Sequence, residues 1–184
     1  MKVAVYSGSF NPLHKGHLAI LNALCAEFDK VLLVVSPRNP LKDIDPESAL
    51  ARLEAARKAV GRHPELDGKV EVSDIEFSLP CPNYTYVTLD TLAEAEPETE
   101  FILTVGSDQL NDIRRWREYR HILKDYGLVV YPREGFDTEA DMESLLKEDS
   151  NYRIRIVDAP TVNISSTAIR ENSAAGINMD EWLM

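Results

Sequence analysis

Short apolar runs alternate with amphipathic helical patterns along this chain of 184 residues. Residues 31–35 read Val-Leu-Leu-Val-Val, and an unbroken apolar run of this length is typical of a β-strand buried on both faces. Strands are predicted at 3–6, 31–35, 70–72, 101–105, 128–131 and 154–157, and helices at 17–28, 46–60, 84–94, 117–125, 138–148 and 166–171. This alternation predicts an α/β fold with a doubly wound, Rossmann-like, mostly parallel sheet and helices on both of its faces.

The loops that follow the strands are the predicted place for function. In a parallel sheet, ligands bind beyond the carboxyl ends of the strands, where the strand order reverses. The loops concerned are 7–17, 36–42, 79–88, 106–116, 132–136 and 159–170. A hydrophobic content of 44% suffices for a substantial core, and the length suits a single domain over residues 1–184.

The composition limits the partners and the compartment. A formal net charge of −11 argues against a nucleic-acid-binding protein, whereas a small anionic ligand needs only a local pocket. Cys25 and Cys81 are far apart and form no metal-binding or disulfide pattern. The start Met1-Lys2 runs directly into a strand and no apolar run reaches membrane-spanning length. We therefore expect a cytoplasmic protein that has no signal peptide and binds no membrane.

The loop after the first predicted strand combines the features of a phosphate site. Residues 8–17 read Gly-Ser-Phe-Asn-Pro-Leu-His-Lys-Gly-His. Gly8 allows a ligand to approach closely, and the helix that follows begins with unpaired N–H groups and a positive dipole end. His14 and His17 are three residues apart and can donate hydrogen bonds to phosphoryl oxygens from one side. Each histidine alone is more often a cap or a surface residue, but the combination predicts phosphate binding.

A second motif follows the last predicted strand, where residues 164–170 read Ile-Ser-Ser-Thr-Ala-Ile-Arg. The hydroxyl groups of Ser165, Ser166 and Thr167 can cap a helix and also bind phosphate oxygens. Arg170 lies on the same helical face as Ser166 and offers a forked cation. The alternative is an ordinary N-cap with a solvated arginine, but the position after the last strand favours phosphate binding.

The motifs resemble those of the nucleotidylyltransferase superfamily. The His-x-Gly-His run at 14–17 resembles its strand-one motif, and 164–170 resembles its I-S-S-T-x-I-R motif. Residues 82–89 are similar to the P-S-Y-T-x-D-T-L segment of bacterial nicotinate-nucleotide adenylyltransferases. Residues 105–110 with Trp116 are similar to their G-x-D-x(n)-W segment. The four motifs come in the family's order and span most of the chain.

The resemblance implies adenylyl transfer from ATP to nicotinic acid mononucleotide, which yields deamido-NAD and pyrophosphate in NAD biosynthesis. The catalytic residues that it implies are His14, His17 and Arg170. The residues implied at ATP are Ser7, Gly8, Ser9, Phe10, His17, Asp108, Ser165, Ser166, Thr167 and Arg170, and those at the mononucleotide are Asn39, Lys42, Tyr84, Thr85 and Trp116. Mg²⁺ is expected to come with ATP, held mainly by the phosphates rather than by the protein.

Several of these residues have structural alternatives. Trp116 can stack on the positively charged pyridine ring of a mononucleotide, or it can be a half-buried packing residue. Asp108 suits a ribose hydroxyl or a Mg²⁺-bound water, and it also suits a helix N-cap. Lys42 can neutralise phosphate charge or be a solvated loop residue. The sequence leaves these pairs open.

The chain also departs from the family pattern. Asn83 stands where the family has serine, and Val87 stands where it has aspartate, so the contacts made near Thr85 differ from the usual ones. Relatives continue through a further helix where this chain has only residues 180–184, so we expect a C-terminal helix that is truncated or short. Alternative functions are adenylyl transfer to nicotinamide mononucleotide or phosphopantetheine, and nucleotide sensing without turnover. A homo-oligomer is compatible with the sequence.

Overall fold

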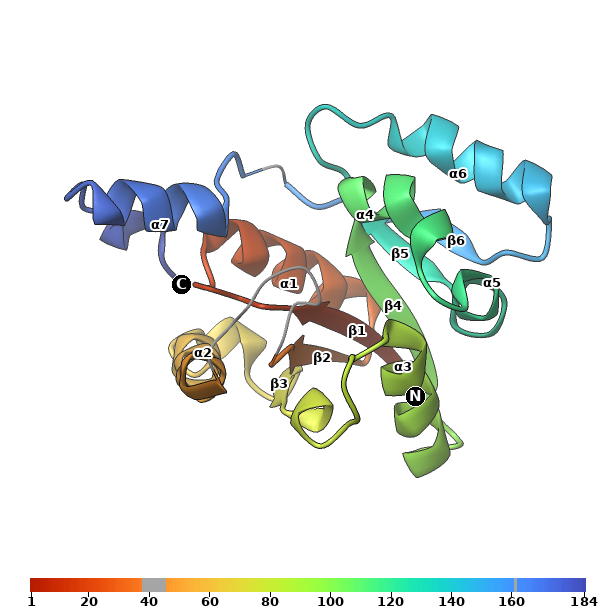
Figure 1. Ribbon diagram of the computed structural model, residues 1–184, viewed down its shortest axis with the longest axis horizontal. Coiled ribbons are helices and arrows are strands. Elements are labelled where there is room, and N and C mark those ends of the chain that lie inside the picture. The colour runs from red at the N-terminus through yellow and green to blue at the C-terminus, as the bar shows by residue number, and fades with distance from the viewer. Residues whose placement is uncertain (38–45, 161) are drawn as a thin grey trace.

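Six parallel strands form one sheet through the middle of the molecule (Figure 1). The computed structural model describes residues 1–37, 46–160 and 162–184. The strands are β1 (Lys2–Gly8), β2 (Lys30–Val35), β3 (Val70–Ser73), β4 (Glu100–Gly106), β5 (Leu128–Tyr131) and β6 (Ile154–Ile156), in the spatial order β3-β2-β1-β4-β5-β6. The predicted fold class and all six predicted strands are confirmed, because every strand end lies within two residues of its prediction.

Helices cover both faces of the sheet. They are α1 (Lys15–Glu27), α2 (Pro46–Val60), α3 (Thr85–Ala95), α4 (Ser107–Asp112), α5 (Tyr119–His121), α6 (Thr138–Glu148) and α7 (Ser166–Ala174). Figure 1 shows α1, α2 and α7 on one side and α3 to α6 on the other. The structure corrects two predictions: α4 lies within the expected loop 106–116, and the helix expected at 117–125 is α5 followed by a π-helical segment, Ile122–Tyr126.

The side chains of each central strand alternate between two hydrophobic cores. On β1, Ala4 and Tyr6 face the core beneath α1 and α2, whereas Val3 and Val5 face the core beneath α3 and α6. A fully buried side chain such as Leu21 of α1 contributes about 1.5–3 kcal/mol by leaving water. The two cores fix the sheet between its helices, and so they fix the loops at its carboxyl edge.

The strand order reverses at β1, which pairs with β2 on one side and β4 on the other. The loops that leave β1 and β4 therefore run to opposite faces, and a crevice opens between them at the carboxyl ends of the strands. This is the place that the sequence predicts for ligands.

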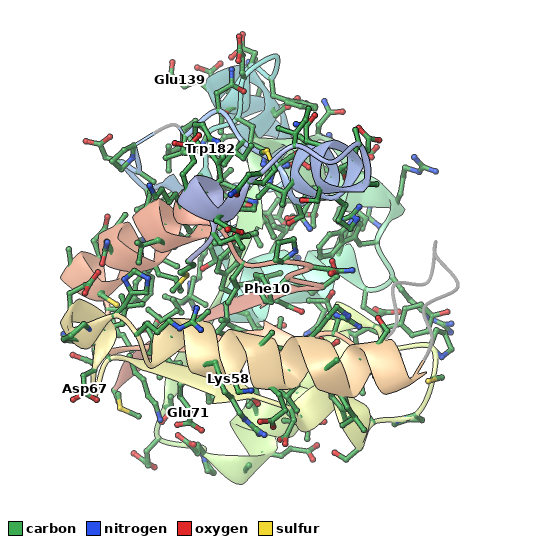
Figure 2. All side chains as sticks on the ribbon, turned by 90° about the vertical axis from the view of Figure 1, so that its left-hand side faces the viewer. Phe10, Lys58, Asp67, Glu71, Glu139 and Trp182 are labelled. Atoms are coloured by element: carbon green, nitrogen blue, oxygen red, sulfur yellow. The ribbon has the colours of Figure 1, made fainter. Side chains whose placement is uncertain are left out.

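After α7 the chain returns to the loop that follows β1. A 3₁₀ turn, Asp180–Trp182, precedes Leu183, which forms an antiparallel bridge with His14. The backbone N–H of Met184 donates to the carbonyl of Leu13 at 3.4 Å, and its side chain joins the core beneath α1. Figure 2 labels Trp182 on this turn. The start of α1 is thus covered by a distant part of the chain.

Candidate active site

Among the described residues, two cavities at the carboxyl edge of the sheet are lined by residues of the predicted motifs. The larger has a volume of about 640 Å³, and its lining includes Ser7, Gly8, Ser9, Glu76, Tyr84, Thr85, Asp108 and Trp116. The smaller has a volume of about 280 Å³, and its lining includes His14, Gly16, His17, Arg133, Ser165 and Ala168. Four residues expected at ATP, namely Ser7, Gly8, Ser9 and Asp108, thus line the cavity that holds the residues expected at the mononucleotide. Asn39 and Lys42 lie outside the described residues.

His14 and His17 are held by the first turn of α1. The Nδ1 atom of His14 accepts a hydrogen bond from the backbone N–H of Gly16 at 3.1 Å. The backbone N–H of His14 donates in turn to Nδ1 of His17 at 3.2 Å, and the two ring centroids are 3.8 Å apart. A Cβ at position 16 would lie 3.0 Å from the His14 ring, so glycine keeps this ring in place.

Burial determines the charge of the two rings, and the hydrogen bonds determine their tautomer. Burial lowers the pKa of His14 to about 4, with a smaller contribution from the charge of Arg133. Burial, followed by His14 and Arg133, holds the pKa of His17 well below its usual range. Because each Nδ1 accepts a backbone N–H, the single ring proton of the neutral form is on Nε2. At neutral pH the pair therefore offers two uncharged N–H donors.

Phe10, one of the residues expected at ATP, is only 5% exposed. Its ring packs edge-on against His17 with centroids 5.3 Å apart, and Figure 2 shows it in the interior of the molecule. A Cβ at Gly8 would lie 3.1 Å from this ring. The Phe10 side chain therefore supports His17 from behind, and only its backbone is left to contact a ligand.

Arg133 is a functional candidate that is not among the predicted site residues. Its Nη1 lies 3.3 Å from Oδ2 of Asp108, and its guanidinium lies over the ring of Tyr131 at 5.6 Å. Arg133 lines the smaller cavity and Asp108 the larger one, so their ion pair lies between the two. A sequence signal exists, because Arg133 comes two residues after the end of a buried strand, in a loop predicted to be functional.

Asp108 retains an unused acceptor. Its Oδ1 atom is buried and has no hydrogen-bond partner among the described residues. The residue that caps α4 is Gly106, whose N–H donates to Oε1 of Gln109 at 3.1 Å, so Asp108 is not the N-cap. A Cβ at position 106 would lie 2.4 Å from Oδ1 of Asp108. The glycine therefore leaves room for the carboxylate, which lines the larger cavity.

The start of α7 lies against the loop that follows β1. Ser165 is the N-cap of α7, and its Oγ accepts from the N–H of Ala168 at 3.1 Å. The hydroxyl of Ser166 donates to the carbonyl of Pro12 at 3.0 Å. Arg170 donates to the carbonyl of Asn11 at 2.7 Å and to Oγ1 of Thr167 at 3.2 Å. The capping prediction is confirmed, and the motif forms a wall facing the loop of His14.

Aromatic and cationic groups gather at the larger cavity. Trp116 is half-buried in its lining, and the rings of Tyr84 and Tyr86 stack with centroids 6.1 Å apart. The guanidinium of Arg117 lies 5.1 Å from the centre of the Tyr84 ring. Thr85 is the first residue of α3, whose N-terminal N–H groups attract anions. The arrangement suits a flat ring that carries a negative group.

No group of three or more His, Cys, Asp or Glu side chains is arranged to hold a metal ion within residues 1–37, 46–160 and 162–184. In the same described ranges, no helix is long and apolar enough to cross a membrane.

Comparison with known proteins gives consistent matches. A family model described as cytidylyltransferase-like matches residues 5–172. A probable nicotinate-nucleotide adenylyltransferase of Flavobacterium johnsoniae is 39% identical, over 100% of this chain and 92% of the relative. One from Bacteroides fragilis with the same name is 40% identical, over 99% of this chain and 87% of the relative.

A solved structure shares the fold. Plasmodium falciparum nicotinic acid mononucleotide adenylyltransferase complexed with NaAD matches with a TM-score of 0.81 and 21% identity, over 98% of this chain and 87% of that one. At this level of identity the match concerns the fold alone.

Proposed function

The chain belongs to the cytidylyltransferase-like family, and we propose that it transfers the adenylyl group of ATP to nicotinic acid mononucleotide, giving deamido-NAD and pyrophosphate. One observation carries the proposal: the cavity of His14 and His17 and the larger aromatic cavity adjoin at the Arg133–Asp108 ion pair. Two substrates bound in these cavities would bring their phosphates together. The bacterial relatives named for this activity support the choice of substrates.

The reaction needs alignment more than proton transfer. An oxygen of the mononucleotide phosphate, already a competent nucleophile, forms a bond to the α-phosphorus of ATP. The bond from that phosphorus to the bridging oxygen breaks, and its electron pair leaves with pyrophosphate. Positioning and charge stabilisation supply the catalysis.

We assign ATP to the smaller cavity. The Nε2–H groups of His14 and His17 donate to oxygens of the α-phosphoryl group, and Arg133 supplies the positive charge that two neutral imidazoles lack. Ser166, Thr167 and Arg170 bind the β- and γ-phosphates from the wall formed by α7.

We assign the mononucleotide to the larger cavity. Trp116 stacks on the pyridine ring, and Thr85 with the N–H groups at the start of α3 holds the ring carboxylate. Asp108, which lines this cavity, accepts from a ribose hydroxyl. The roles of Asn39 and Lys42 at this substrate remain predictions.

A divalent metal ion accompanies ATP in nucleotidyltransferases generally, and we propose Mg²⁺ here. Carried by the phosphates, it neutralises part of their charge. The proposal also includes a single catalytic domain that acts in the cytoplasm.

Pyrophosphate release tests the function. The purified protein with ATP and Mg²⁺ is expected to release pyrophosphate with nicotinic acid mononucleotide, and less efficiently with nicotinamide mononucleotide or phosphopantetheine. A preference for nicotinamide mononucleotide or phosphopantetheine would show that the proposed acceptor is wrong. Nucleotide binding without pyrophosphate release would identify a sensor instead.

Replacement of Trp116 by alanine tests the assignment of the acceptor cavity. Loss of a stacking partner, worth about 1–3 kcal/mol, is expected to raise KM for the mononucleotide by about tenfold or more, with little change in KM for ATP. Trp182→Ala is the matched control, because Trp182 is not in the lining of either cavity. An equal rise of both KM values in Trp116→Ala would contradict the assignment.

A further inference from the structure

Glu76 is a buried carboxylic acid that neither the motifs nor the proposed reaction uses. It lies in the 3₁₀ turn Ile75–Phe77, shortly after β3, and it is only 5% exposed. Its side chain belongs to the wall of the larger cavity, together with Ser7, Tyr84 and Thr85. A buried acid in an acceptor pocket is unusual and calls for a reason.

The carboxylate joins three parts of the fold. Its Oε1 atom accepts from the hydroxyl of Ser7 at the end of β1 and from that of Thr88 in α3, each at 3.2 Å. The Oγ atoms of Ser7 and Ser36 are 3.1 Å apart. Ser36 is therefore within hydrogen-bond distance of Ser7, and either hydroxyl can be the donor. One acid thus orders a hydroxyl chain that links β1, the loop after β2 and α3.

The same residue also holds the approach to α3. Its backbone carbonyl accepts from Nδ2 of Asn83 at 2.8 Å. Asn83 directly precedes Tyr84 and Thr85, the residues that we assign to the mononucleotide. The segment 83–88 is therefore bound to Glu76 at both ends: Asn83 donates to its backbone carbonyl, and Thr88 donates to its carboxylate.

Folding stability does not explain why an ionisable acid is buried at position 76. Burial raises the pKa of Glu76, and the hydrogen bonds from Ser36, Thr88 and Ser7 offset this effect only in part. The ionised form is therefore less favourable in the fold than in water, and a neutral side chain of the same shape would suit folding at neutral pH better.

We propose that Glu76 is a positioning residue for the acceptor: its carboxylate holds α3 through Thr88 against the ends of β1 and β2, and its backbone carbonyl holds Asn83, in the arrangement that binds the mononucleotide. The inference rests on the proposed function, because it concerns the same cavity. It requires that Glu76 act on one substrate and not on the other, since Glu76 lines only the larger cavity.

The test compares Glu76→Gln with the wild type in steady-state kinetics and in chemical unfolding. KM for nicotinic acid mononucleotide is expected to rise by about tenfold, while KM for ATP stays within about twofold. The free energy of unfolding at neutral pH is expected to be unchanged or higher. Glu71→Gln on β3, an exposed position, is the matched control and should alter neither KM.

Thr88→Val provides a second route if Glu76→Gln does not fold, because it removes only the donor from α3 and is expected to show the same KM split. An unchanged KM for the mononucleotide, or an equal rise of both KM values, would overturn the proposal. Absence of turnover in the wild type would instead refute the proposed function, so the two failures are distinguishable.

Discussion

At the residue level, His14 and His17 become donors because backbone amides occupy their Nδ1 atoms. Burial keeps both rings neutral, and a neutral donor in a site of low polarity binds a phosphoryl oxygen without the cost of burying a second charge. The fixed positive charge comes from Arg133, whose guanidinium stays protonated at any physiological pH. The two histidines thus supply hydrogen bonds, and Arg133 supplies the positive charge.

Replacing His17 by alanine removes one of these donors. We expect kcat to fall by about 10²–10³-fold, the effect of losing one preorganised donor. The free energy of unfolding should fall by only about 1–2 kcal/mol, because His17 no longer accepts from the backbone N–H of His14 at the start of α1. Single-turnover kinetics and urea unfolding measure the two effects. His63→Ala, outside both cavities, is the control, and full turnover in His17→Ala would disprove the catalytic role.

At the level of helices and loops, arginines tie the functional loops to their supports. Arg52 of α2 is 5% exposed and donates to the carbonyls of Ser9, Ser36 and Pro37, so it joins the loops after β1 and β2. Arg170 of α7 makes the corresponding tie to Asn11. The planar guanidinium serves several acceptors at fixed angles, which a lysine ammonium cannot do.

Arg170→Lys keeps the positive charge on α7 but removes the planar guanidinium that donates to two acceptors at once. We expect KM for ATP to rise by about tenfold, because the phosphate wall is held less well, with KM for the mononucleotide nearly unchanged. Steady-state kinetics with each substrate varied in turn measures both. Arg153→Lys, an exposed ion pair with Glu100, serves as control. If Arg170→Lys left both KM values unchanged, as that control should, the proposed role of Arg170 in phosphate binding would be contradicted.

Across the molecule, the sheet places two cavities side by side while two hydrophobic cores hold their walls. The crevice is built where β1 and β4 send their loops to opposite faces. The formal net charge of the chain is −11, whereas the site itself contains neutral imidazoles and the guanidinium of Arg133. Anionic substrates therefore meet a local environment unlike the average of the chain.

The buried histidines make folding depend on pH. The pKa of His14 is about 4 in the folded protein against 6.5 for an ordinary histidine, so the unfolded chain binds more protons between these values. Stability from this residue is complete above pH 6.5 and is lost as the pH falls towards 4. Glu76, whose pKa is raised, acts in the opposite direction.

We therefore expect His14→Asn, which keeps a capping acceptor, to flatten the fall in Tm over this pH range relative to the wild type. Thermal unfolding followed at several pH values gives the slope, with His63→Asn for comparison. A slope identical to that of the wild type would contradict the lowered pKa.

Local patterns predicted the regular elements well and the irregular ones poorly. The six strands follow from short runs rich in apolar residues, and helices α2 and α6 follow from helical periodicity. The six-residue helix α4 is too short to show a helical period, so the sequence predicts a loop there. The π-helical segment ends at Gly127, where a Cβ would lie 2.8 Å from Arg153. Such a clash with a distant residue leaves no mark in the local sequence.

The sequence by itself determines the residue types at the site, because glycines, histidines and hydroxyls at fixed spacings act within one loop or one helical turn. The folded arrangement then supplied the rest: the inward turn of Phe10, the neutral state of His14 and His17, and the roles of Arg133 and Glu76. These depend on burial and on contacts such as Ser7 with Glu76, 69 residues apart, and Arg170 with Asn11, 159 residues apart. The burial of a side chain depends on every element that packs around it, so the spacing of residues within one segment does not determine it.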